Sequence, residues 1–240
     1  MARVEESLEK AKTLLREGKC REACELFSEI RQNAKILRPD QNEDLLYHYA
    51  MALKAIDRRG LAEKCLRDLY HEAHDRERRE LECKAVHELG TMALEENRYS
   101  EAIKLYREEL TLWYSGMDHY FAGLALNYLA QGHCFLAMGH TTEAQMYLKH
   151  AVTYAQTGQD ARLKGRALAI LADLQLRDGK RKEAMKLLRQ ALSSLRQDAS
   201  SEEIPEIEKE LEKIEKDVSE NRSKASAQLE RCTEVHESQL

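Results

Sequence analysis

The chain has 240 residues, of which 34% are charged, 10 are glycine and only 2 are proline. An all-β or α/β domain needs many more turn residues, whereas abundant Ala, Leu, Glu, Lys and Arg favour a nearly all-helical protein. Residues 1–198 contain 32 basic and 31 acidic side chains, against 6 and 12 in residues 199–240. Neither part is therefore a basic surface suited to nucleic-acid phosphates, and we expect no nucleic-acid partner.

Helical periodicity and short turns predict ten helices in five antiparallel pairs. Their approximate ranges are 4–17 and 20–37, 42–56 and 59–74, 77–96 and 99–114, 120–138 and 141–157, and 161–178 and 180–197. Pro39 is expected in the loop after the first pair, where its missing N–H costs nothing.

A six-residue motif marks the turn inside each predicted pair. It consists of a turn residue, three variable positions, an acid or its equivalent, and an alanine. The copies are GKCREA, DRRGLA, NRYSEA, GHTTEA and GKRKEA, and they end at Ala23, Ala62, Ala102, Ala144 and Ala184. These anchoring alanines are 39, 40, 42 and 40 residues apart. A period in that range is typical of a solenoid of stacked repeats.

Two further positions keep the same register. The residue twelve places before the anchor is always small, and the residue four places after it is always large and apolar. The small residues are Ala11, Ala50, Gly90, Gly132 and Ala172, and the large ones are Phe27, Leu66, Tyr106, Leu148 and Leu188. We expect the small residue to permit a close helix crossing, and the large residue to fill the gap between neighbouring repeats.

This pattern resembles the tetratricopeptide repeat (TPR). The clearest matches are Leu89-Gly90 with Ala102 and Tyr106, and Leu171-Ala172 with Ala184, Leu188 and Ala191. The period is near 40 rather than about 34 residues and the usual closing proline is missing, as in a long-repeat variant. The resemblance implies an all-α, right-handed superhelical solenoid over residues 1–198. Its five helix-turn-helix repeats would span approximately 4–38, 42–76, 77–116, 120–158 and 161–198.

Residues 200–222 predict a separate helix that starts with Ser200-Ser201, two glutamates and Pro205. Its apolar residues fall at heptad spacing: Ile204, Ile207, Leu211, Ile214 and Val218. The favoured interpretation is a capping helix over the fifth repeat. The alternative is a coiled coil that forms a homodimer through Ile204–Val218. We expect residues 223–240 to be a frayed or disordered tail.

The resemblance also implies a binding site, because the first helix of each TPR pair lines a concave groove that holds a partner. The matching residues are Lys12, Tyr47, Met51, Lys54, Lys84, His87, Thr91, Leu129, His133, Arg166 and Asp173. Their mixed character suits a partly apolar peptide or helix. The chaperone-binding carboxylate clamp of the family would need asparagines that this chain lacks. The other interpretation of each residue is packing between repeats.

No catalytic or cofactor site is predicted. The chain has no GxxxxGK[ST], GxGxxG or GxSxG sequence, and His71 and His74 are three residues apart rather than the four of a zinc-protease helix. The tract Arg76–Arg79 is interpreted as a solvated helix face. Scattered cysteines, no visible secretory signal and no long apolar run predict a cytoplasmic protein with no membrane partner.

The sequence therefore predicts a non-catalytic adaptor or scaffold that binds a protein or peptide. The alternative function is a regulator that changes conformation on binding a short signalling peptide. Relatives of that kind that act on DNA carry an N-terminal helix-turn-helix domain. The first repeat begins within a few residues of Met1, so direct action on DNA is not expected.

Overall fold

The computed structural model describes residues 2–32, 37–114, 120–197, 202–217 and 219, and every regular element in those ranges is a helix. The helices are α1 (Ala2–Arg16), α2 (Cys20–Gln32), α3 (Pro39–Ala55), α4 (Arg59–Asp75), α5 (Arg79–Glu95), α6 (Tyr99–Tyr114), α7 (Phe121–Ala137), α8 (Thr141–Thr157), α9 (Ala161–Arg177) and α10 (Arg181–Leu195), followed by a helix over residues 204–217. The prediction of an all-α chain with paired helices is confirmed.

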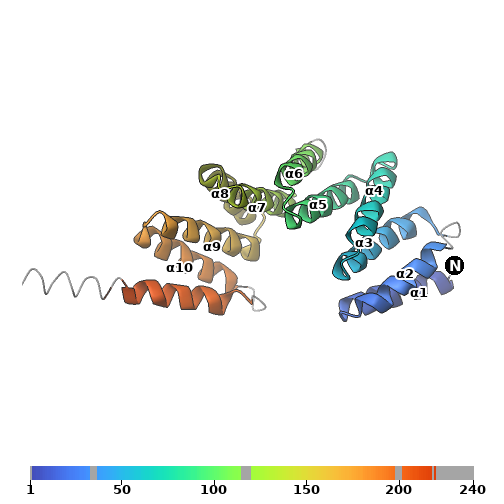
Figure 1. Ribbon diagram of the computed structural model, residues 1–240, viewed down its shortest axis with the longest axis horizontal. Helices are drawn as coiled ribbons and strands as arrows, with labels where there is room; N and C mark the ends of the chain where they lie inside the picture. Colours follow the sequence, from blue (N-terminus) through green and yellow to red (C-terminus); the bar gives the residue numbers. More distant parts are fainter. Residues whose placement is uncertain (1, 33–36, 115–119, 198–201, 218, 220–240) are drawn as a thin grey trace, which may run out of the picture. The chain divides into compact units, whose positions relative to one another are not determined.

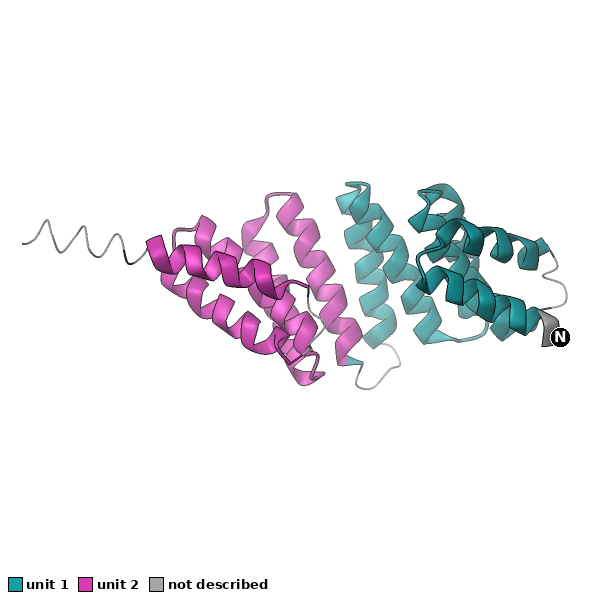
Figure 2. Ribbon diagram, turned by 90° about the horizontal axis from the view of Figure 1, so that it is seen from below, with its two compact units in different colours: residues 1–120 teal, residues 121–240 magenta. Residues whose placement is uncertain are grey.

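The chain divides into two compact units, residues 1–120 (unit 1) and 121–240 (unit 2), which are coloured separately in Figure 2. Unit 1 holds the pairs α1/α2, α3/α4 and α5/α6 (Figure 1). Its core is a continuous cluster to which all three pairs contribute, with Phe27, Leu45, Leu66 and Met92 fully buried. Each repeat thus buries its apolar face against the next one, as in other helical repeat proteins.

The turn inside each pair uses the same backbone conformation. The residue five places before the anchoring alanine has a positive φ in every repeat: Gly18 (77°), Asp57 (60°), Asn97 (61°), Gly139 (79°) and Gly179 (75°). The following N–H bonds a carbonyl five residues back, for example Lys19 N to Leu14 O at 2.9 Å. This is the Schellman ending of a helix, and it explains why glycine recurs there.

The small and large positions meet inside a pair. A Cβ on Gly90 would lie 2.8 Å from the ring of Tyr106, and a Cβ on Gly132 would lie 2.9 Å from Leu148. Because Tyr106 and Leu148 are fully buried, the two glycines permit these close crossings. We expected the large residue in the gap between repeats. Leu148 meets Gly132 of its own pair and also joins a core cluster with Ala167 and Leu171 of the next pair, and Phe27 reaches Tyr49 of the next pair.

Pro39 is the first residue of α3 and not a loop residue. This position suits proline, because the first N–H of a helix has no partner within the helix.

Unit 2 contains α7/α8, α9/α10 and the helix of residues 204–217. Ile207 and Ile214 are buried in one cluster with Leu168, Leu188 and Leu192. The apolar stripe of the C-terminal helix therefore packs on α9 and α10 of its own chain, as a capping helix does. The helix begins at residue 204, four residues later than expected, and the predicted tail at 223–240 lies outside the described residues.

Candidate functional site

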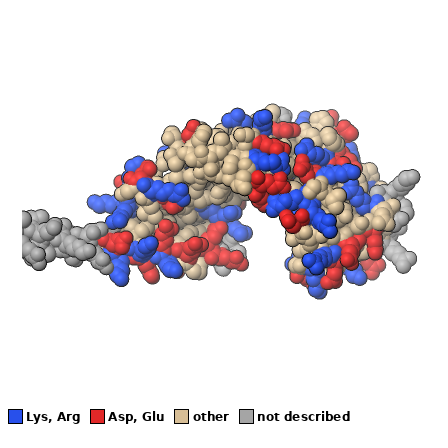
Figure 3. Space-filling view, in the orientation of Figure 1, with Lys and Arg blue, Asp and Glu red and all other residues tan. Residues whose placement is uncertain are grey.

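Seven of the predicted binding residues lie on first helices of unit 1. We call these seven the first-helix face: Lys12 on α1, Tyr47, Met51 and Lys54 on α3, and Lys84, His87 and Thr91 on α5. Lysine, arginine, aspartate and glutamate side chains are intermixed on the side of unit 1 seen in Figure 3. Whether a charged residue of this face can bind a partner therefore depends on whether its charge is already paired within the chain.

Lys12 is bound on two sides. Its Nζ lies 2.8 Å from Glu9 Oε1 and 2.9 Å from Asp44 Oδ2 of α3, and Asp44 is also 3.2 Å from His48. The hydrogen bond to Glu9 raises the pKa of Lys12, and the bond from His48, together with Lys12, lowers the pKa of Asp44. Lys12 thus joins α1 to α3 in addition to being half-buried on the face.

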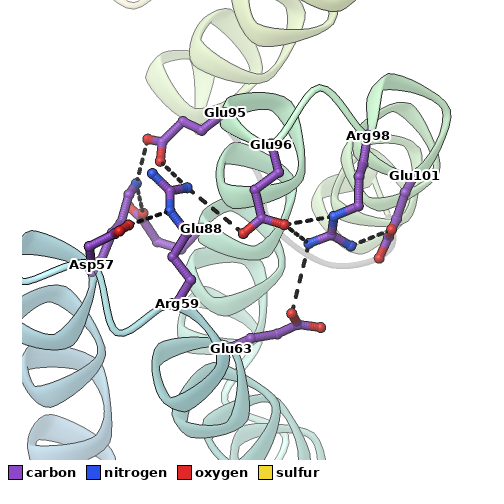
Figure 4. Close-up of polar contacts among 9 residues, drawn as sticks. Asp57, Arg59, Glu63, Glu88, Glu95, Glu96, Arg98 and Glu101 are labelled. Carbon is purple, nitrogen blue, oxygen red and sulfur yellow. Dashed lines mark hydrogen bonds and ion pairs between the residues drawn. The ribbon is translucent and has the colours of Figure 1, made fainter.

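Lys54 belongs to a larger network that ties the second pair to the third (Figure 4). Its Nζ lies 3.0 Å from Glu95 Oε1 and 3.5 Å from Glu88 Oε2, both on α5. Arg59 at the start of α4 reaches the same Glu95 at 3.1 Å. Arg98 continues the network through Glu96 at 2.8 Å, Glu63 at 3.8 Å and Glu101. Because Lys54 already pairs with two carboxylates in this network, its main role is to hold the second and third helix pairs together.

Tyr47 and Met51 are the apolar part of the face. They lie one turn apart on α3, and both are half-buried against the core of unit 1. Burial, followed by the negative charge of Glu88 on α5, raises the pKa of Tyr47. Glu88 also lies 3.5 Å from Lys54, which is one turn beyond Met51 on α3. The two side chains therefore offer an apolar surface next to the Lys54–Glu88 ion pair.

His87 points into its own helix pair. The side chain is 15% exposed, and Nδ1 lies 2.9 Å from Glu109 Oε2. Glu109 in turn accepts a 3.0 Å hydrogen bond from Trp113 Nε1. Burial lowers the pKa of His87, but the hydrogen bond and charge of Glu109 outweigh it and leave the pKa above its usual range. His87 is therefore part of an internal polar cluster.

Thr91 also makes a contact inside the third helix pair, since its hydroxyl is 3.2 Å from the hydroxyl of Tyr106.

Lys84 differs from the other two lysines of the face in its exposure and in its partner. It is exposed, and its one ion pair with a described residue is the surface contact with Glu80 on the same helix, at 2.6 Å. Of the three lysines of the face, Lys84 is thus held least tightly by the protein itself.

The four predicted residues of unit 2 have different surroundings. Leu129 is 3% exposed and lies in the core, so packing accounts for it and it offers no surface to a partner. His133 is half-buried, and burial together with the charge of Arg166 lowers its pKa. Arg166 bonds Glu203 at 3.1 Å, and Asp173 bonds Arg177 at 2.7 Å. Arg166 is thus partly occupied by the segment that leads into the helix of residues 204–217.

Sequence reasoning missed three acids that are almost fully buried: Glu43, Glu82 and Glu109. The Arg76–Arg79 tract supplies partners for two of them. Its arginine side chains are 38–49% exposed, as expected of a solvated tract, but the tract lies at the turn between α4 and α5 and is not a helix face. Arg76 and Arg78 lie 2.9 and 3.4 Å from the carboxylate of Glu43. Arg79 lies 3.4 Å from Glu82, which also contacts His74 at 2.7 Å. The arginines pair with these acids and offset the desolvation free energy of burying a carboxylate.

The described side chains include no cluster of three or more His, Cys, Asp or Glu residues arranged to hold a metal ion. Burial raises the pKa of the Cys24 and Cys134 thiols to about 11 and that of Cys83 to about 12. Such thiols stay protonated at neutral pH and are poor nucleophiles. Among the described helices, none combines the length and the apolar character that a bilayer-spanning segment requires.

Comparison with solved structures agrees with the repeat motif. The chain is similar to the "kinesin light chain nearly identical TPR-like repeats" of Podosopora anserina, with 20% identity, a TM-score of 0.64, and coverage of 83% of this chain and 97% of that one. It is also similar to BtubC (BKLC) from P. vanneervenii, with 17% identity, a TM-score of 0.66 and coverage of 83% and 91%.

A third similar structure is MamA from Desulfovibrio magneticus RS-1, with 15% identity, a TM-score of 0.58 and coverage of 82% and 97%. No protein-family model matches the sequence, and neither does any curated protein. The likeness at these low identities concerns the fold: the chain has the TPR-like α-solenoid fold that its motif predicts.

Proposed function

We propose that the chain is a non-catalytic adaptor that binds a segment of a partner protein on the first-helix face of unit 1. The observation that supports this most directly is the apolar pair Tyr47 and Met51, which stays half-exposed on α3 one turn before Lys54, the partner of Glu88 on α5 at 3.5 Å. A peptide or helix with apolar side chains can bury this surface and gain free energy in proportion to the apolar area removed from water.

The charges around the pair define what kind of segment fits. Lys12 and Lys54 are already bonded to Asp44, Glu88 and Glu95, so these lysines are poor receptors for a terminal carboxylate. Lys84 has only an exposed partner, and such surface pairs contribute about 0–1 kcal/mol. Exchanging that partner for a carboxylate of a bound segment therefore costs little. The expected partner segment is partly apolar and carries an acid near Lys84.

The test is affinity capture from a native extract with the wild-type chain and with a Met51→Glu/Lys84→Glu variant. Lys104→Glu, an exposed change on the second helix α6, is the matched control. We expect a partner identified by mass spectrometry to bind the wild type and the control but not the double variant, with unchanged far-UV circular dichroism. A partner that the double variant retains, or no protein partner at all, would refute this proposal.

The alternative of a peptide-sensing regulator stays a prediction, as do a cytoplasmic location and a homodimer formed through Ile204–Val218. A thermal-shift screen against short peptides separates the two functions. A sensor is stabilised by a free short peptide, whereas an adaptor responds to the intact segment of its partner.

A further inference from the structure

Unit 2 contains a groove that lies away from the predicted binding residues. It has a volume of about 530 Å³ and runs between α8 and α10 above α9. Leu168 and Leu171 of α9 form its floor, on the side of that helix opposite Arg166 and Asp173. Cavities of roughly 300–1,000 Å³ are typical of binding sites.

The corresponding groove is bridged by side chains in unit 1. Between α2 and α4, Arg31 donates to Asp68 at 2.7 Å and to the sulfur of Cys65 at 2.8 Å. Between α4 and α6, the hydroxyl of Tyr70 donates to Glu108 at 2.9 Å. In both cases the donor lies eight residues after the anchoring alanine of its repeat, and its carboxylate lies six residues after the next anchor.

The same two positions in unit 2 are Val152 on α8 and Gln190 on α10, and both line the groove. A valine side chain has no donor, so the bridge that closes the unit 1 grooves cannot form here. Val152 and Leu187 are instead half-exposed apolar side chains on the two walls. Val152 and Gln190 replace the bridging polar pair of unit 1, and the groove between α8 and α10 therefore stays open.

Each wall of the groove also carries a lysine. Lys149 on α8 and Lys186 on α10 both line it and are exposed, and neither forms an ion pair with a described residue. Glu183 is the acid among the lining residues. The groove therefore combines an apolar floor with a cation on either side.

The C-terminal helix shows which kind of helix this chain accommodates on α10. It buries Ile207 and Ile214, while Glu208 bonds Arg196 at 2.6 Å and Glu215 bonds Arg189 at 2.7 Å. An apolar stripe flanked by carboxylates is thus matched to a helix surface flanked by cations. The α8–α10 groove likewise combines apolar side chains with a lysine on each wall.

We propose that the α8–α10 groove is a second docking site, separate from the first-helix face, and that it binds an acidic amphipathic helix of a partner protein. The apolar stripe of that helix covers Val152, Leu171 and Leu187, and its carboxylates pair with Lys149 and Lys186. Charge complementarity sets the orientation, and apolar burial provides most of the affinity.

The test uses a fluorescein-labelled, end-blocked peptide with the sequence of residues 202–218, added to the full chain and followed by fluorescence anisotropy. The closing variant is Val152→Arg/Gln190→Asp, which installs the arginine–aspartate bridge of unit 1 without changing the net charge. The second variant is Lys149→Gln/Lys186→Gln. The matched control is Lys182→Gln, an exposed lysine of α10 that does not line the groove.

We expect saturable binding that both groove variants weaken about tenfold or more and that Lys182→Gln leaves unchanged. Hydrogen exchange in α8 and α10 should slow when the peptide is bound, and a scrambled peptide of equal charge should bind weakly. Circular dichroism verifies that the variants fold. No saturable binding, or equal affinity in the closing variant and the wild type, would overturn the proposal. Since the groove residues all lie in unit 2, Met51→Glu/Lys84→Glu should leave peptide binding intact.

Discussion

The buried pair of His87 and Glu109 should make the free energy of unfolding depend on pH. Glu109→Gln keeps the shape of the side chain and an oxygen for Trp113 Nε1, but it removes the charge that lies 2.9 Å from His87 Nδ1. The pKa of His87 is raised in the folded chain. The stabilisation from its protonated form is therefore fully present below the unfolded pKa, about 6.5, and is lost as pH rises through the folded pKa.

The expected loss follows from these contacts. Leaving a protonated, 15% exposed histidine without its charged partner should cost about 1–3 kcal/mol at pH of about 5.5. At a pH above the folded pKa His87 is neutral in both proteins, so the loss should be smaller there than at pH of about 5.5. The two values should differ by about 1.4 kcal/mol for each unit by which Glu109 raises the pKa.

Urea unfolding followed by tryptophan fluorescence measures this directly, because Trp113 is the only tryptophan and bonds Glu109 itself. Glu25→Gln removes an equal charge from an exposed residue of α2 and serves as the control. If Glu109→Gln lowered the free energy of unfolding equally at both pH values, His87 would not be held protonated by Glu109, and the argument would fail.

Two further predictions concern unit 2. Ile214→Ala should destabilise it by about 2–4 kcal/mol, because the side chain is only 6% exposed and packs against α9 and α10. Hydrogen exchange in those two helices should become faster. An unchanged exchange rate would contradict the packing of the C-terminal helix on them. Gln159→Gly should stabilise the chain by about 0.5–1 kcal/mol because Gln159 has φ of 56°, whereas Gly179→Ala at φ of 75° should destabilise it by about 1–2 kcal/mol. Opposite shifts in thermal unfolding test this pair, and shifts of the same sign would refute the backbone argument.

The sequence alone predicted the features that depend on local order along the chain. Alanine anchors about 40 residues apart placed all ten paired helices, and Gly18, Gly139 and Gly179 marked turns that need a positive φ. The small and large positions of each repeat identified Gly90 and Gly132 as close crossings. These features follow from helix periodicity and backbone sterics, which act between residues near one another in sequence.

The tertiary structure decided which of the predicted binding residues are available. Lys54 and Lys84 look equivalent in the sequence, but Glu95 of another repeat binds Lys54, whereas among the described residues Lys84 forms an ion pair only with Glu80 on its own helix. The burial of Glu43 and the open groove at Val152 were likewise invisible. Each depends on side chains 30 to 40 residues away that meet only when repeats stack. Electrostatic and packing energies act through space, so the stacked neighbours, and not the motif, determine what each residue can bind.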